Sequence, residues 1–283
     1  MGWTLHSRVI LVKFCLIDIK EELNKMLNLI RFFGTRRMRL RLLPFVKLLL
    51  TLSGKSWNDF YRWMLELQER NTTLESILRE PRQKTGRGLF AWWLGEYHCS
   101  FMQEFGLDPQ QTVLDFGCGY GRTAIPLIKY LDPGKYIGTE LSEKRLSLAT
   151  EWVKREGLQN CEPTFIATTD NTMSFLQDGS VDAIWTLSVF THMPEKEMHQ
   201  VLGAFWRVLK ESGVAYFHYN SPTNSEIVHK ATVKDFYWED TFIEKTVSSH
   251  GFAFKRVENW VDDLDKKIGM RSNMLRLTKC NVG

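Results

Sequence analysis

The chain has 283 residues, of which 43% are hydrophobic and 25% are charged, and its formal net charge is +4. This size and composition allow a full hydrophobic core, so we expect one large domain plus an extension. The five cysteines are scattered and share no metal-binding spacing with the seven histidines. This pattern argues against a structural zinc site and for a reducing compartment. We therefore expect a cytoplasmic protein without a bound metal.

The first 56 residues are strongly basic, with 11 Lys and Arg residues against three Asp and Glu residues. Apolar residues at helical spacing over 16–30 predict an amphipathic helix that packs on the core or on a second subunit. Residues 31–50 combine Lys and Arg with Leu and Phe, a composition found in helices at membrane surfaces and in arms that bind nucleic acid. Packing, peripheral contact with the inner membrane surface and nucleic-acid binding all stay open. The arm shows no membrane-spanning run and no signal peptide.

Two further helices are expected between this arm and the main domain. The first begins after Ser56 and presents an apolar stripe of Trp57, Phe60, Tyr61, Met64 and Leu67. Thr72 and Glu75 predict the start of the second. The polar stretch 81–88 is typical of a joint, so we place a basic helical extension at 1–84 and the main domain at 85–283. An aromatic-rich helix over 89–105 precedes the first strand.

A glycine-rich turn follows that first strand. Residues 112–122 read T-V-L-D-F-G-C-G-Y-G-R, with a buried strand that ends at Asp115, glycines at alternate positions, and a helix over 122–131. A strand that passes through glycines into a helix lets a ligand lie against bare backbone at the helix N-terminus. A dinucleotide site needs G-x-G-x-x-G, and its third glycine would fall on Arg122, so that pattern fails. A tight turn without a ligand is the alternative.

Two more strands end in acidic residues. The strand over 136–140 ends in Glu140, and Ser142 is placed to cap a helix over 143–156. A carboxylate at this edge can accept hydrogen bonds from both hydroxyls of a ribose; a solvated acid is the alternative. The strand at 165–170 ends in Asp170, and Asn171 lies beside it. Asp170 and Asn171 would either contact a ligand or lie in an exposed loop.

The fourth motif, D-G-S-V-D over 178–182, predicts a turn into a strand at 181–187, which opens onto the loop S-V-F-T-H. A helix follows from Pro194 towards Gly213, and then a strand at 214–219. Over about residues 112–219, the sequence resembles the class I S-adenosylmethionine-dependent methyltransferases. The resemblance lies in the order of its motifs: the D-x-G-x-G-x-G turn, the two strand-terminal acids and D-G-S-V-D.

The resemblance implies a Rossmann-like α/β fold with a seven-stranded, mostly parallel sheet in the order 3-2-1-4-5-7-6 and helices on both faces. A helix at 239–250 and strands at 253–258 and 273–279 would complete it. S-adenosyl-L-methionine is the implied cofactor, and Asp170 would accept from its adenine amino group. In this family the aromatic helix at 89–105 tends to cover the cofactor, which would make Tyr97 or Trp93 a lid residue. The expected cofactor contacts are Asp115, Gly117, Gly119, Gly121, Glu140, Leu141, Asp170, Asn171 and Ser188.

A sulfonium methyl group is already activated, so its transfer needs little more than an aligned nucleophile. A general base helps when the acceptor must lose a proton. His192 and His218 follow the fourth and fifth strands and are the candidate catalytic residues; packing roles are the alternative. The chain lacks the N/D-P-P-Y/F/W segment that the resembled enzymes use on exocyclic amines of adenine or on glutamine. It also lacks a P-C dipeptide, whose cysteine would attack a pyrimidine ring. We therefore expect methyl transfer to an O or N atom of a metabolite, sugar or lipid-linked precursor. An RNA methyltransferase and a non-catalytic cofactor-binding module are the alternatives.

Overall fold

The computed structural model describes residues 54–79, 92–222, 236–258, 260 and 270–280. The described residues from Trp57 onward belong to one compact unit. The predictions for the basic arm, for the joint at 81–88 and for the domain boundary after residue 84 lie outside the described residues and stay predictions. Among the helices that the structure describes, none is long and apolar enough to cross a membrane.

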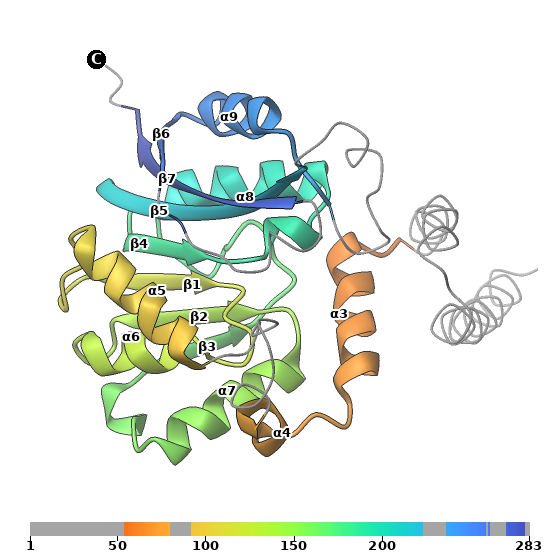
Figure 1. Cartoon of the computed structure of the whole chain (residues 1–283), viewed down its shortest axis with the longest axis vertical. Helices are drawn as coiled ribbons and strands as arrows, with labels where there is room; N and C mark the ends of the chain where they lie inside the picture. The colour runs from red at the N-terminus through yellow and green to blue at the C-terminus, as the bar shows by residue number, and fades with distance from the viewer. Residues whose placement is uncertain (1–53, 80–91, 223–235, 259, 261–269, 281–283) are drawn as a thin grey trace, which may run out of the picture. The chain divides into compact units, whose positions relative to one another are not determined.

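A seven-stranded sheet in the order β3-β2-β1-β4-β5-β7-β6 forms the centre of this unit (Figure 1). Its strands are β1 (Val113–Phe116), β2 (Tyr136–Glu140), β3 (Thr164–Ala167), β4 (Val181–Thr186), β5 (Leu209–Pro222), β6 (Phe252–Arg256) and β7 (Met270–Lys279). The first five strands are parallel, and β7 runs antiparallel to both of its neighbours. The fold and strand order that the resemblance implies are confirmed.

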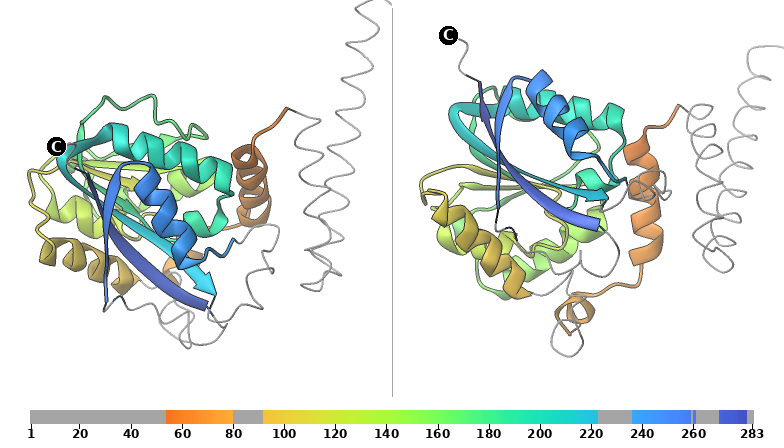
Figure 2. Two further views of the ribbon diagram at one scale, coloured as in Figure 1. Left: turned by 90° about the horizontal axis from the view of Figure 1, so that it is seen from above. Right: turned by 45° about the horizontal axis from the view of Figure 1, so that its top comes forward.

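Helices cover both faces of the sheet (Figure 2). One face carries α8 (Glu195–Val208) and α9 (Asp240–Ser249), and the other carries α5 (Trp92–Glu104), α6 (Ala124–Tyr130) and α7 (Glu143–Arg155). A separate cluster of buried side chains fills each interface, so the sheet is apolar on both faces, as expected for parallel strands. The helix predicted to run towards Gly213 ends at Val208, because Leu209 already pairs with Val181 as the first residue of β5.

Two short helices precede α5. They are α3 (Trp57–Glu69) and α4 (Leu74–Arg79). The cap of α4 is formed by Thr73 and Ser76, each of which accepts a hydrogen bond from the other's backbone N–H, and not by Thr72 with Glu75 as predicted. Leu74 and Ile77 of α4 are buried in the same apolar cluster as α6 and α7.

The parallel strands bring several loops to one edge of the sheet. The carboxyl ends of β1, β2, β3 and β4 are neighbours in the sheet, so the loops that follow them converge at this edge. Open α/β sheets bind ligands at the carboxyl ends of their strands. At the opposite, amino-terminal edge, Asp182 makes a set of structural contacts.

Asp182, the last residue of the D-G-S-V-D motif, joins three strands at the amino-terminal edge. Its Oδ2 accepts from the Thr112 N–H at 2.9 Å, and both of its oxygens lie 2.8 Å from Nζ of Lys210. This side chain therefore fixes the start of β1 against β4 and β5. The motif's second aspartate is explained by folding and needs no ligand.

We predict that Asp182→Ala lowers the free energy of unfolding by about 1–3 kcal/mol, because it leaves a partly buried N–H and an ammonium group without their acceptor. Chemical denaturation measures this change. Glu75→Ala is the matched control: Glu75 also forms an ion pair, with Arg155, but both side chains are 55% exposed, and this substitution should cost no more than about 1 kcal/mol. Equal losses in the two variants would contradict this role of Asp182.

Candidate active site

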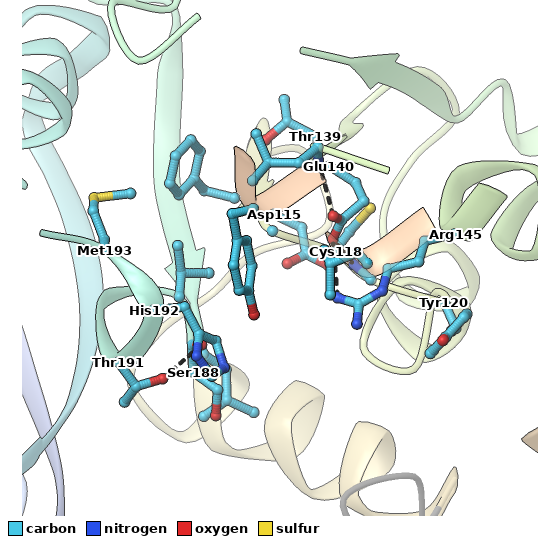
Figure 3. A pocket seen from close by; sticks show the side chains of 18 of the residues that line it. Asp115, Cys118, Tyr120, Thr139, Glu140, Arg145, Ser188, Thr191, His192 and Met193 are labelled. Atoms are coloured by element: carbon cyan, nitrogen blue, oxygen red, sulfur yellow. Dashed lines mark hydrogen bonds and ion pairs between the residues drawn. The ribbon is translucent and has the colours of Figure 1, made fainter. Parts of the chain in front are cut away.

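A pocket of about 600 Å³ opens at the carboxyl-terminal edge of the sheet. Figure 3 shows Ser188 and His192 at one end of it, Tyr120 and Arg145 at the other, and Asp115 between them. The pocket wall includes nine of the residues singled out from the sequence, namely Asp115, Gly117, Gly119, Glu140, Leu141, Asp170, Asn171, Ser188 and His192. Gly121 and His218 are not part of this wall.

The glycines after β1 have different functions, although all three have positive φ. A Cβ atom added to Gly119 would meet no atom within 4 Å, so the bare backbone at this position opens onto the pocket. A Cβ atom at Gly117 would lie 2.4 Å from Cγ2 of Val189, and one at Gly121 would lie 3.2 Å from the Cβ of Ala149. Gly121 therefore allows the loop to pack on α7. The expectation that it contacts the cofactor is not supported.

Asp115 is the third residue of β1, just before Phe116, and it lines the pocket. Its side chain is 2% exposed, and its Oδ2 accepts a hydrogen bond from the Tyr136 hydroxyl at 2.8 Å. Cys118 lies beside it in the glycine loop. Burial raises the pKa of the Cys118 thiol well above its usual value, and the charges of Asp115 and Glu140 add to this effect. The thiol therefore stays protonated and packed.

Glu140 is held by backbone N–H groups and is not a solvated acid. Its Oε1 accepts from Leu141 at 2.9 Å and from Ser142 at 3.1 Å, and its Oε2 accepts from Gly119 at 3.1 Å. A carboxylate offers about four acceptor positions. Oε1 is therefore filled, and Oε2 has room for one more donor. With these bonds intact Glu140 can accept one ribose hydroxyl, and not both as predicted.

Asp170 organises its own loop. Its Oδ1 accepts from the backbone N–H and the hydroxyl of Thr172, and its Oδ2 accepts from the same two groups of Ser174, at 2.6–2.9 Å. Burial opposes ionisation, but these hydrogen bonds outweigh it and lower the pKa of Asp170. All of its acceptor positions are used. With these bonds intact, Asp170 has no acceptor position left for an adenine amino group, so the expected contact would need this loop to rearrange and stays a prediction.

His218 is buried behind the pocket. The Ser188 N–H donates to its Nδ1 at 3.1 Å, and its Nε2 lies 2.7 Å from Oγ of Ser272. The ring is 1% exposed. Ser188 has a positive φ, which a non-glycine residue rarely adopts, and the bond to His218 stabilises it there. The structure thus corrects the prediction that His218 is catalytic: it positions the loop after β4.

His192 stays a candidate because its ring lines the pocket. The ring stacks on Tyr61 of α3, with centroids 5.3 Å apart and an interplanar angle of 23°. The backbone carbonyl of His192 accepts from Nε1 of Trp57 at 3.0 Å. Both contacts come from α3, so this helix fixes the orientation of His192.

Sequence reasoning missed that one face of α3 forms a wall of the pocket. Five residues of α3 line it, namely Asn58, Tyr61, Leu65, Gln68 and Glu69. The predicted apolar stripe correctly indicated a buried face. Three of the five lining side chains are polar, namely Asn58, Gln68 and Glu69, and these polar residues were the sequence signal that could have indicated a pocket wall. The aromatic helix, α5, is expected to cover the cofactor with Tyr97 or Trp93. In the structure, Tyr97 packs against Trp260 and does not line the pocket. The side chain of Trp93 lies outside the described residues.

Asn58 and Asn171 connect α3 to the loop after β3. Nδ2 of Asn58 donates to Oδ1 of Asn171 at 2.7 Å and to the carbonyl of Thr169 at 3.1 Å. The Asn171 amide in turn donates to Gln200 of α8 at 3.1 Å. Asn171 lines the pocket, as predicted, and its contacts also hold the wall together.

Arg145 is a second residue that the sequence did not reveal. It lies in the first turn of α7 and forms a two-pronged ion pair with Glu69, through Nε at 2.9 Å and Nη2 at 2.5 Å. Its Nη1 is 3.9 Å from Oε2 of Glu140. Burial by itself lowers the pKa of Arg145, but the hydrogen bonds to Glu69 and the two carboxylate charges raise it, so the group stays charged.

The donor and acceptor set of the pocket fits a nucleoside cofactor of the implied kind. The open backbone at Gly119 leaves space that a side chain would fill, and Glu140 keeps one acceptor position for a hydroxyl group. In the part of the chain that the structure describes, no three His, Cys, Asp or Glu side chains are grouped so that they could hold a metal ion.

Comparison with known proteins agrees with this fit. Residues 113–213 match a family model described as a methyltransferase domain. Over 111 residues, 39% of this chain, the sequence is 32% identical to sterol 24-C-methyltransferase erg6 of Aspergillus fumigatus. Over 107 residues, 37% of this chain, it is 33% identical to O-methyltransferase 3 of Dictyostelium discoideum. The matched regions span only 28% and 24% of these two relatives.

A solved structure shares the fold. Magnesium protoporphyrin IX methyltransferase of Synechocystis PCC 6803, determined with bound S-adenosylmethionine, superimposes with a TM-score of 0.56 at 16% identity. The superposition covers 79% of this chain and 97% of that protein. Motif order, sheet topology and the family match agree: residues 113–213 are similar to a methyltransferase domain, and the described sheet has the fold of a methyltransferase solved with bound S-adenosylmethionine.

Proposed function

We propose that this protein transfers a methyl group from S-adenosyl-L-methionine to an O or N atom of a small-molecule acceptor. The observation that carries the proposal is one continuous pocket, with the open backbone of Gly119 and the carboxylate of Glu140 at one part of its wall and His192 at another. The names of the two relatives indicate transfer to carbon in one and to oxygen in the other. They support a small-molecule methyltransferase without fixing the acceptor atom.

The first part of the wall would hold the cofactor. The Gly117–Gly119 backbone would lie against it, Glu140 would accept from a ribose hydroxyl, and Leu141 and Asn171 would line the sides. The sulfonium supplies an activated methyl group, so the main task of the protein is to bind and align the two reactants. The closed wall formed by α3 would also exclude water from the site.

The other part of the wall would receive the acceptor. Tyr61, His192, Asn220 and Tyr237 line it, and the two arginines among the described lining residues, Arg122 and Arg145, belong to the glycine loop and to α7. The lining residues near His192 are therefore aromatic, neutral polar or, at Val189 and Met193, apolar, a surface that suits an uncharged hydroxyl or amine compound. His192 would remove the proton from such a group.

Calorimetry with S-adenosylmethionine and S-adenosylhomocysteine, followed by release of S-adenosylhomocysteine from a panel of hydroxyl and amine acceptors, tests the function. We expect binding of both nucleosides and release that depends on one acceptor class. Absence of binding would refute the proposal. Binding without transfer to any acceptor would indicate a non-catalytic module instead.

We predict that Gly119→Val abolishes nucleoside binding, because the side chain fills the space that the cofactor needs. Gly134→Val is the matched control, since Gly134 also has a positive φ and open space around it but lies in the turn before β2. Both variants should lose about 1–2 kcal/mol of stability from the backbone conformation. Retention of S-adenosylhomocysteine affinity by the Gly119 variant in calorimetry would place the site elsewhere.

Replacing His192 with Gln should lower kcat by about 10²- to 10⁴-fold and leave the Kd for S-adenosylhomocysteine unchanged, if the acceptor loses its proton to this ring. Steady-state kinetics with an active acceptor measures kcat, and calorimetry measures the Kd. His199→Gln, on α8 outside the pocket, is the control, and an unchanged kcat in the His192 variant would contradict the role.

Asp115 adds a pH dependence to this site. Burial raises the pKa of its carboxyl to about 7, although the hydrogen bond from Tyr136 and the charge of Arg122 act in the opposite direction. In the unfolded chain the pKa is about 3.9, so the folded chain binds more protons between the two values. The stability that protonated Asp115 contributes is complete below about pH 4 and is lost as the pH rises through about 7.

Asp115→Asn keeps an acceptor for Tyr136 and removes the ionisation. We predict that the stability of the unmodified chain relative to this variant falls by up to about 1.4 kcal/mol per pH unit between about pH 5 and 7. Urea denaturation of the cofactor-free proteins across this range measures it. Asp132→Asn, at an exposed turn position, is the control. A difference that stays constant with pH would refute the prediction.

A further inference from the structure

Arg145 lies between two carboxylates that come from different parts of the chain. Glu69 is the last residue of α3, Glu140 is the last residue of β2, and Arg145 follows in the first turn of α7. Two nitrogens of the guanidinium bind Glu69, and the third lies 3.9 Å from Oε2 of Glu140. The guanidinium also faces the ring of Tyr120, 5.2 Å from its centroid.

This cluster differs from an ordinary surface ion pair. The side chains of Glu140, Glu69 and Arg145 are 6%, 14% and 21% exposed. Two-pronged arginine–carboxylate pairs combine strength with a fixed orientation, and limited exposure reduces screening by salt. The chain offers a direct contrast: Arg155 of α7 pairs with Glu75 of α4 at 3.5 Å, but both side chains are 55% exposed.

The position of Arg145 relative to Glu140 has a consequence for binding. Oε2 of Glu140 is the oxygen that still has room for one donor, and Glu69 holds the guanidinium 3.9 Å away, beyond hydrogen-bonding distance. Without Glu69 the guanidinium would be free to move onto Oε2 and fill that position. Without Arg145 the carboxylate of Glu140 would lose its nearby counter-charge, and the end of α3 would lose its connection to α7.

We propose that Arg145, held by Glu69, is a positioning residue that keeps the free acceptor position of Glu140 available to the ribose of the cofactor and fastens α3 over that part of the pocket. The inference rests on the proposed function. Arg145 acts through Glu140 and need not touch the cofactor. The two ends of α3 are then fastened differently, by neutral hydrogen bonds from Trp57 and Asn58 at its start and by an ion pair at its end.

Calorimetry with two nucleosides tests the proposal. S-adenosylhomocysteine and its analogue without the two ribose hydroxyls are titrated into the unmodified chain, Glu69→Gln, Arg145→Lys and the double variant. We expect each single variant to raise the Kd for S-adenosylhomocysteine about tenfold, equivalent to about 1.4 kcal/mol, and to change the Kd for the analogue much less. The double variant should be no weaker than the single ones, because the two residues act as a unit.

Glu75→Gln is the matched control. It removes the charge of the exposed pair with Arg155, which also joins a helix before the sheet to α7, and it should leave both Kd values unchanged. Thermal unfolding of the cofactor-free variants checks that each is folded. A general structural defect would weaken both nucleosides equally, and that result would overturn the proposal.

Unchanged affinity in Glu69→Gln and Arg145→Lys would also overturn it, while the proposed function would stand. Absence of binding to the unmodified chain would refute the proposed function, and this inference with it. The two failures are therefore distinguishable by the unmodified chain alone.

Discussion

The site depends on one buried carboxylate and the backbone groups that satisfy it. Glu140 is 6% exposed, and a charge with so little access to water is stable only when it is paired and hydrogen-bonded. Three N–H groups, from Gly119, Leu141 and Ser142, donate to it. These bonds join the glycine loop after β1 to the start of α7. The same contact thus fixes the shape of the loop and leaves one acceptor position facing the pocket.

Much of this arrangement could be predicted from the sequence because local signals and the parallel sheet agree. The glycine spacing, Ser142 as a helix cap and the apolar strands each indicated their element. Strand order then brought Asp115, Glu140 and the loop of Ser188 to one edge. These features depend on backbone conformation and on neighbours within one strand–helix unit, which a sequence displays directly.

The roles of individual acids and histidines could not be predicted as well, since they depend on which partners use their polar atoms. Glu140 ends β2 and Asp170 follows β3 by three residues, but Thr172 and Ser174 occupy every acceptor position of Asp170. Serine and threonine two and four residues later were a usable local signal. His218 depends on Ser272, 54 residues away, a contact that the sequence does not display. Likewise, the stripe on α3 indicated a buried face but not the pocket that it closes.

The most direct measurement is a crystal structure of the chain soaked with S-adenosylhomocysteine. The account predicts that a ribose hydroxyl lies within hydrogen-bonding distance of Oε2 of Glu140, with the nucleoside passing the open backbone of Gly119 and Asp170 still bound to Thr172 and Ser174. Density for the nucleoside away from this loop, or a ribose that makes no contact with Glu140, would contradict it.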